Sequence, residues 1–215
     1  MSGMLRRSLL LSAPLLASAP RWSFAQSATR GGLTQADLRR IEDYFNSLTT
    51  LKARFLQIGQ SGSSAQGTAW IWRPGRMRFE YDAADGLLLV ASHSQFMQFD
   101  RELGQPSVVP TSATPLSFLL QPQLKLSGDV TVLGGERSGG FVRVTVQRTS
   151  SPSEGQLTLV LAESPMELRQ WVVLDPQRRE TRVTLSEIEV GGRFDPLLFE
   201  FNDPRFMENE ARRRQ

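Results

Sequence analysis

The sequence has no cysteine and only one histidine, His93, among its 215 residues. Zinc sites are built from clustered cysteine and histidine ligands, so this composition argues against a zinc centre. A Ser-His-Asp hydrolase would depend on His93 alone, and the chain has no G-x-S-x-G nucleophile motif. No phosphate-binding glycine motif opens a predicted helix. We therefore expect no enzyme activity, no catalytic residues, no metal site and no cofactor.

Long apolar runs are also missing. Residues 9–19 form an apolar run that is too short to span a bilayer. Arg6 and Arg7 precede this run, and the small residues Ser23 and Ala25 suit signal peptidase. These features predict a signal peptide over residues 1–25 that is cleaved after export. Both the twin-arginine and the general secretory routes stay open, because a paired arginine occurs in both kinds of signal.

An excess of charge of one sign is missing once the predicted signal is removed. The whole chain has 25 basic and 22 acidic residues. The signal contains three of the 25 basic residues and no acidic one, which leaves 22 of each sign. A chain with this balance has no electrostatic footprint for DNA or RNA. We therefore expect no nucleic-acid partner.

What the sequence does contain is an aromatic stretch at residues 67–81, which reads as two short strands joined at Pro74-Gly75. Alternate side chains of a strand share one face. A two-residue turn would place Trp72 opposite Met77 and give one large apolar face, although proline does not suit the turns that such hairpins prefer. That face would carry Trp70, Trp72, Met77, Phe79 and Tyr81. It fits either the core of a β-sandwich or a curved sheet around a cavity.

Two amphipathic helices and a series of strands surround this stretch. The first helix is predicted over residues 34–51, with Thr34 as its cap and Asp37 completing a capping box. The second begins at Thr114-Pro115 and is too short and too apolar to be stable without an apolar surface to cover. Strands are predicted at 51–58, 67–72, 76–81, 87–91, 95–99, 105–109, 129–133, 141–148, 156–161, 168–174, 181–188 and 198–201, with Gly134-Gly135 as a break.

This order of elements predicts one mainly β domain over residues 26–215, with residues 207–215 as a frayed tail. The apolar surface exceeds what one face of a sheet needs, which favours a curved antiparallel sheet with a helical cover and a hydrophobic interior. A filled core would give much the same pattern.

Several motifs, in this order and spacing, resemble the LolA family, the periplasmic carriers of outer-membrane lipoproteins. They cover nearly all of the exported chain. The motifs are LKARFLQ at 51–57, the Trp-Arg-Pro run within 67–81, LLLVA at 87–91, TPL at 114–116, LRQWVVLD at 168–175, and FDPLLF at 194–199 followed by Pro204.

The resemblance implies an unclosed antiparallel β half-barrel covered by an α-helical lid, with a cavity that takes lipoprotein acyl chains. In the family, an arginine before the proline holds the lid closed through backbone hydrogen bonds, and Arg73 matches it. Met77 stands where the family often has phenylalanine, and Ser92-His93-Ser94 stands at an expected Asp-Gly turn. We expect the cavity to be lined by Phe45, Trp70, Trp72, Met77, Phe79, Tyr81, Phe96, Phe118, Leu119 and Leu120.

The resemblance also implies the partners. They are lipidated outer-membrane lipoproteins, an inner-membrane ABC complex that releases them, and an acceptor at the outer membrane. We expect a monomer in the periplasm. Two other functions stay open: a lipid- or lipoprotein-sensing regulatory domain on the same fold, and a β-domain with a filled core that acts through its surface.

Overall fold

The computed structural model describes residues 32–82, 86–100 and 105–201. The predicted signal peptide and the predicted frayed tail lie outside these residues. In the described part, eleven strands form one antiparallel sheet in the order β6-β5-β4-β3-β2-β1-β11-β10-β9-β8-β7. The strands are β1 Thr50–Gly59, β2 Ser64–Trp72, β3 Arg76–Tyr81, β4 Leu87–Ser92, β5 Gln95–Asp100, β6 Gln105–Pro110, β7 Val130–Ser138, β8 Phe141–Arg148, β9 Gln156–Glu163, β10 Met166–Leu174 and β11 Glu180–Val190.

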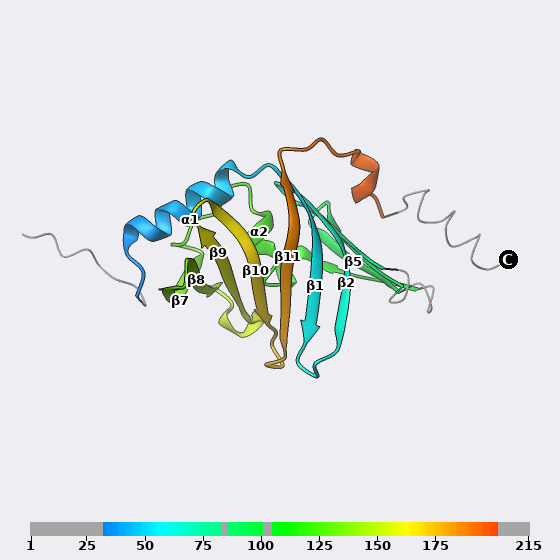
Figure 1. Ribbon diagram of the computed structural model, residues 1–215. Helices are drawn as coiled ribbons and strands as arrows, with labels where there is room; N and C mark the ends of the chain where they lie inside the picture. The colour runs from blue at the N-terminus through cyan, green and yellow to red at the C-terminus, as the bar shows by residue number, and fades with distance from the viewer. Residues whose placement is uncertain (1–31, 83–85, 101–104, 202–215) are drawn as a thin grey trace, which may run out of the picture.

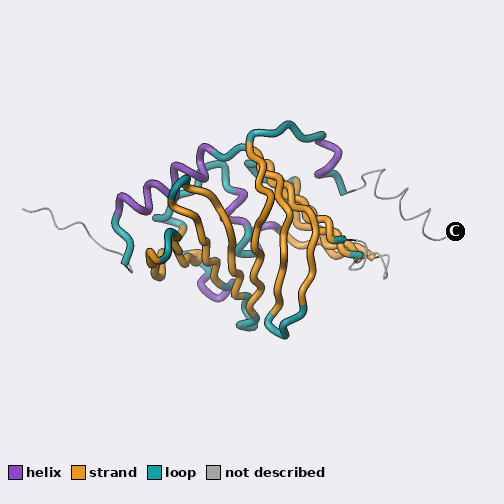
Figure 2. Tube along the Cα trace, viewed as in Figure 1, coloured by secondary structure: helices purple, strands orange, loops and turns teal. Residues whose placement is uncertain are grey.

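The sheet is curved but not closed, because its two edge strands, β6 and β7, do not pair with each other. Within the described ranges two α-helices accompany it, α1 at Gln35–Ser47 and α2 at Ser117–Leu120, together with 3-10 turns η1 Thr111–Ala113, η2 Pro152–Glu154 and η3 Pro196–Phe199. Figure 1 shows α1 over the β9–β10 side and α2 within the curve of the sheet. Figure 2 shows that strands make up most of the described part of the chain. The predicted half-barrel with a helical cover is therefore confirmed.

Helix α1 forms as its capping box predicts. The Thr34 side chain accepts from the Asp37 N–H at 3.2 Å, and the Asp37 carboxylate accepts from the Thr34 N–H at 3.0 Å. Its apolar stripe, including Ile41 and Phe45, is buried in the main core. The helix ends at Ser47, earlier than predicted, because Leu48 already has extended backbone and Thr50 begins β1.

The same carboxylate ties α1 to the sheet, since Arg137 on β7 donates to Asp37 at 2.6 Å. The backbone hydrogen bond from Thr34 is the main reason that the pKa of Asp37 lies below its ordinary value of 3.8, while burial opposes this shift. A carboxyl whose folded pKa is depressed contributes stability above its unfolded pKa and loses that contribution as the pH falls through the folded pKa. Asp37 therefore stabilises the fold at neutral pH.

We expect Asp37→Asn to lower the free energy of unfolding by about 1 kcal/mol at neutral pH, because the capping bond weakens and the Arg137 pair is lost. Urea unfolding of both proteins over a pH series measures this difference. The difference should shrink as the pH falls below about 4, where the wild-type carboxyl becomes protonated. A difference that stays constant down the series would contradict this role for the ionised carboxylate.

The hairpin between β2 and β3 differs from the predicted one by a single residue. Its loop has three residues, with a cis Arg73-Pro74 bond and Gly75 at φ +81°, so Trp72 pairs with Arg76 instead of facing Met77. A one-residue change in register moves every side chain of a strand to the other face. The predicted single aromatic face is therefore wrong: Trp70 and Trp72 point away from Met77, Phe79 and Tyr81.

Trp72 instead packs on the convex side of the sheet. Its ring lies 5.7 Å from the ring of Phe199, and the Arg76 guanidinium stacks 4.3 Å above it. Phe199 ends η3, where residues 198–201 were predicted as a strand. That prediction is wrong, because Asp195 caps a 3-10 turn by accepting from the Leu197 N–H at 2.9 Å and Pro196 has no N–H for a ladder.

The predicted break at Gly134-Gly135 is also wrong, because β7 runs through both glycines with a bulge after Val132. A Cβ atom at Gly135 would lie 2.4 Å from Cδ1 of Leu33, so the glycine gives Leu33 room to pack before α1. Glycine in a strand often marks such a bulge or close approach. His93 is exposed at the β4–β5 turn and has φ 50°.

The main core lies on the concave face of the sheet. Its centre is a chain of edge-to-face aromatic rings, in which Phe55 lies 5.0 Å from Tyr81 and 5.1 Å from Phe79, and Phe79 lies 5.8 Å from Trp171. Trp171 is 1% exposed. No helix among the described residues is long and apolar enough to cross a membrane.

Candidate functional site

The chain that follows edge strand β6 crosses the concave side and returns as the other edge strand, β7. We call residues 111–121 of this crossing, which include η1 and α2, the lid. The Thr114 side chain accepts from the Leu116 N–H at 3.1 Å, but the prediction that Thr114 caps the lid helix is wrong, because the cap position is Leu116 and no side chain caps it. The helix begins at Ser117, two residues later than predicted. The lid therefore joins the two open edges of the half-barrel.

Three apolar side chains of the lid face the sheet. Phe118, Leu119 and Leu120 are 2%, 1% and 5% exposed, and they belong to the main core. This burial explains how so short a helix is stable, because fully burying one such side chain is worth about 1.5–3 kcal/mol. The lid thus occupies the concave face with side chains of the same character as an apolar ligand.

The structure brings together eight of the ten residues predicted to line a cavity. Seven are buried in the main core, and Phe96 is partly buried against it. Trp70 and Trp72 are the exceptions, because the hairpin register places them on the other face. The seven are Phe45, Met77, Phe79, Tyr81, Phe118, Leu119 and Leu120.

Arg73 lies at the end of β2 and reaches the C-terminal end of the lid. Its Nη2 donates to the Gln121 carbonyl at 2.8 Å, and the Gly75 N–H donates to the Leu120 carbonyl at 2.9 Å. These are the orphan carbonyls of the last turn of α2. The β2–β3 loop therefore holds one end of the lid through two hydrogen bonds.

The Arg73 guanidinium is buried among apolar groups. The residue is 7% exposed, its guanidinium carbon lies 5.9 Å from the centre of the Phe45 ring, and its Nε is buried without a partner. Burial lowers the pKa of Arg73 from its ordinary range, and no ion pair among the described residues involves it. Because a buried unpaired charge is costly, the desolvation of Arg73 offsets part of the stabilisation that its hydrogen bond to the lid contributes.

Beyond the lid, the chain is fastened to α1. The Asn46 side chain donates to the Leu124 carbonyl at 3.1 Å and accepts from the Leu124 N–H at 2.8 Å. The Glu42 carboxylate accepts from the Leu126 N–H at 2.6 Å. Leu124 and Leu126 are buried in the main core. Side chains of α1 thus bind the backbone groups of the segment after the lid, which a neighbouring strand would otherwise bind.

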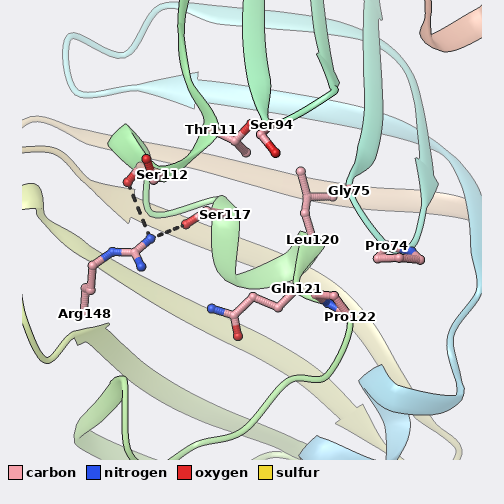
Figure 3. Close-up of a pocket in the computed structure, with 10 residues that line it drawn as sticks. All are labelled: Pro74, Gly75, Ser94, Thr111, Ser112, Ser117, Leu120, Gln121, Pro122 and Arg148. Atoms are coloured by element: carbon pink, nitrogen blue, oxygen red, sulfur yellow. Dashed lines mark hydrogen bonds between the residues drawn. The ribbon is translucent and has the colours of Figure 1, made fainter.

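A pocket of about 410 Å³ lies beside the lid at the mouth of the half-barrel (Figure 3). The β2–β3 loop contributes Pro74 and Gly75, and Arg148 lies across the lid from them. Its other lining residues are Ser94, Thr111, Ser112, Ser117, Leu120, Gln121 and Pro122. Within the described ranges, no group of three or more His, Asp or Glu side chains could hold a metal ion.

Sequence reasoning found Arg73 through a motif but missed Asn46, Glu42 and Arg148. Asn46 and Glu42 look like ordinary surface residues of an amphipathic helix, and Arg148 looks like the charged end of a strand. Their partners lie 78, 84 and 31 residues away in the chain. No local pattern indicates contacts at such separations.

The protein is a lidded half-barrel. Its antiparallel sheet is unclosed, and a short helix that is hydrogen-bonded to Arg73 covers the apolar concave face. The family model described as outer membrane lipoprotein carrier protein LolA matches residues 46–202, and the chain belongs to this family. The resemblance seen in the motifs is therefore confirmed. The description of this family is that of a lipoprotein carrier.

Individual relatives are distant but match along most of their length. The chain is 24% identical over 204 residues to an outer-membrane lipoprotein carrier protein of Methylococcus capsulatus, covering 91% of this chain and 93% of the relative. It is 26% identical over 214 residues to one of Azotobacter vinelandii, covering 92% and 94%. Its fold is similar to the crystal structure of a DUF1329 family protein from Desulfovibrio piger, with 11% identity, a TM-score of 0.50, and coverage of 77% and 95%.

Proposed function

We propose that this protein is a periplasmic carrier that binds the acyl chains of lipoproteins on its concave face and moves them from the inner to the outer membrane. The observation that carries the proposal is the lid. Its side chains Phe118, Leu119 and Leu120 pack on the apolar concave face, and a few hydrogen bonds hold the lid in place. Family membership and the names of the relatives support the same function.

The energetics suit reversible binding. Burying one CH₂ group is worth about 0.8 kcal/mol, so one long acyl chain gains on the order of 10 kcal/mol. In the closed protein the lid side chains already occupy that surface, and each costs about 1.5–3 kcal/mol to expose. Cargo and lid therefore compete for one apolar face, which keeps the net affinity low enough for cargo to leave.

In this mechanism the lid swings away and acyl chains take the place of its side chains. Arg73 acts as a latch that favours the empty, closed protein, because opening breaks its bond to the Gln121 carbonyl. The acyl chains then contact the apolar residues that remain on the walls, which include Phe45, Met77, Phe79, Tyr81 and Phe96.

We propose the partners that the family resemblance implies. An inner-membrane ABC complex that releases lipoproteins supplies the loaded state, and an acceptor at the outer membrane receives the cargo. We propose that the protein acts in the periplasm as a monomer after loss of residues 1–25.

The test is binding of a fluorescent fatty acid to the purified protein, followed by displacement with a diacylated lipoprotein and with the same lipoprotein after its acyl chains are removed. We expect uptake of the fatty acid and displacement by the acylated form alone. Equal displacement by both forms would contradict acyl-chain recognition. No uptake would favour a filled core that acts through its surface.

A further inference from the structure

A second arginine holds the other end of the lid. Arg148 is the last residue of β8, next to edge strand β7. Its Nη2 donates to the Ser117 hydroxyl at 2.8 Å and, at a longer 3.5 Å, to the Ser112 carbonyl. Its guanidinium carbon lies 5.5 Å from the centre of the Phe118 ring. Figure 3 shows this side chain reaching the lid from the wall opposite Gly75 and Pro74.

Glu154 in η2 orients this arginine. The Arg148 Nε donates to the Glu154 carboxylate at 3.1 Å, and the two side chains are 22% and 37% exposed. Guanidinium has donors in a fixed planar fork, so one edge can bind a carboxylate while another donates to a hydroxyl. The ion pair thus leaves Nη2 directed at Ser117.

The two arginines are on opposite walls of the half-barrel. Arg73 follows β2 and Arg148 ends β8, and the strand order places β1, β11, β10 and β9 between these two strands. Arg73 binds the carbonyl after α2, whereas Arg148 binds the first residue of α2. The short helix α2 is therefore hydrogen-bonded at both ends, and its two partners lie on opposite walls of the half-barrel.

We propose that Arg148 is a second latch of the lid, oriented by Glu154, and that lid opening requires release of its bond to Ser117. Arg148 is a positioning residue in this scheme, and its role deepens the proposed function, because a carrier of this kind must open the lid to load. The two latches differ in environment: the Arg73 guanidinium is buried and unpaired, whereas that of Arg148 is partly exposed and paired.

Hydrogen–deuterium exchange of the intact, cargo-free protein tests this proposal by mass spectrometry. The amide protons of Leu116 to Leu119 are held by hydrogen bonds within the lid, and they exchange when the lid opens and frays. We expect Arg148→Met to speed exchange of lid peptides about ten-fold, the usual effect of losing one charge-assisted bond. Peptides from β9 and β10 should keep the wild-type rate.

Matched variants separate a latch from a general loss of stability. Ser117→Ala should reproduce the effect and add little to Arg148→Met in the double variant, while Ser117→Thr keeps the hydroxyl and the wild-type rate. Glu154→Gln should speed lid exchange less than Arg148→Met. Arg143→Met is the control, because Arg143 lies on the same strand and pairs with Glu136 away from the lid.

The outcomes are distinct. Faster exchange confined to the lid, shared by Arg148→Met and Ser117→Ala, supports the latch. Unchanged lid exchange overturns it, and so does an equal rise in the lid and in β9–β10, which indicates a merely structural role. Since no cargo is present, failure here is distinguishable from failure of the proposed function, which the fatty-acid assay tests by itself.

Discussion

Arg73→Leu is expected to leave uptake of an acylated cargo intact and to reduce its delivery to acceptor membranes by roughly 10- to 100-fold. The variant loses the bond to the Gln121 carbonyl, which disfavours the empty, closed state. In the loaded state, the wild-type guanidinium would meet hydrocarbon instead of a carbonyl, whereas leucine packs well against acyl chains. Both changes shift the equilibrium toward retained cargo.

A transfer assay between two sets of membranes measures this effect, with loading and delivery scored separately. Arg76→Leu is the matched control, because Arg76 follows the same loop but stacks on Trp72 at 4.3 Å on the convex side. That variant should load and deliver normally. Normal delivery by Arg73→Leu would remove Arg73 from the mechanism, and failure of both variants to load would point to damage to the hairpin.

Gly67→Ala is expected to destabilise the protein by about 3 kcal/mol or more, because the sheet has no space for a methyl group there. Gly67 lies on β2, where an added Cβ atom would sit 2.1 Å from the Glu80 carbonyl oxygen and 2.8 Å from Cε1 of Phe55. Both the backbone of β3 and the Phe55 ring would have to move. That ring belongs to the aromatic chain at the centre of the concave face.

Urea unfolding of the two proteins measures the change. Gly134→Ala provides the control, because Gly134 is also a strand glycine but an added Cβ atom there meets nothing within 4 Å. We expect that substitution to change the free energy of unfolding by less than about 0.5 kcal/mol. If the two substitutions had equal effects, the loss would come from strand propensity rather than from the close contact at Gly67.

Sequence reasoning succeeded where the deciding interaction is local. The capping box of α1 joins Thr34 to Asp37, three residues away, so its geometry follows from spacing alone. Two-residue periodicity helped to find the strands of the sheet, and Gln105–Pro110 forms a strand where one was predicted at residues 105–109. Arg73 was found because it sits within a motif that the family shares.

Sequence reasoning failed where one residue of register or one distant contact decides. Two-residue and three-residue loops between β2 and β3 are both compatible with the sequence. The shorter loop would place Trp70 and Trp72 together on the face of Met77, whereas the three-residue loop places both on the other face of the sheet. Gly134-Gly135 reads as a break unless the approach of Leu33 to the strand is known. The contact of Arg148 with the lid could not be predicted from the sequence either, because its partner Ser117 lies 31 residues earlier in the chain.

The amino-acid sequence by itself therefore determined the class of fold, the amphipathic character of its helices and strands, and membership of a carrier family, because periodicity, capping and motif order are properties of neighbouring residues. Only the tertiary structure decided which aromatic residues face the interior and which groups fasten the lid. Those outcomes depend on strand register and on contacts between distant segments. Such contacts exist only in the folded, curved sheet, where Arg73 and Arg148 on opposite walls both reach α2.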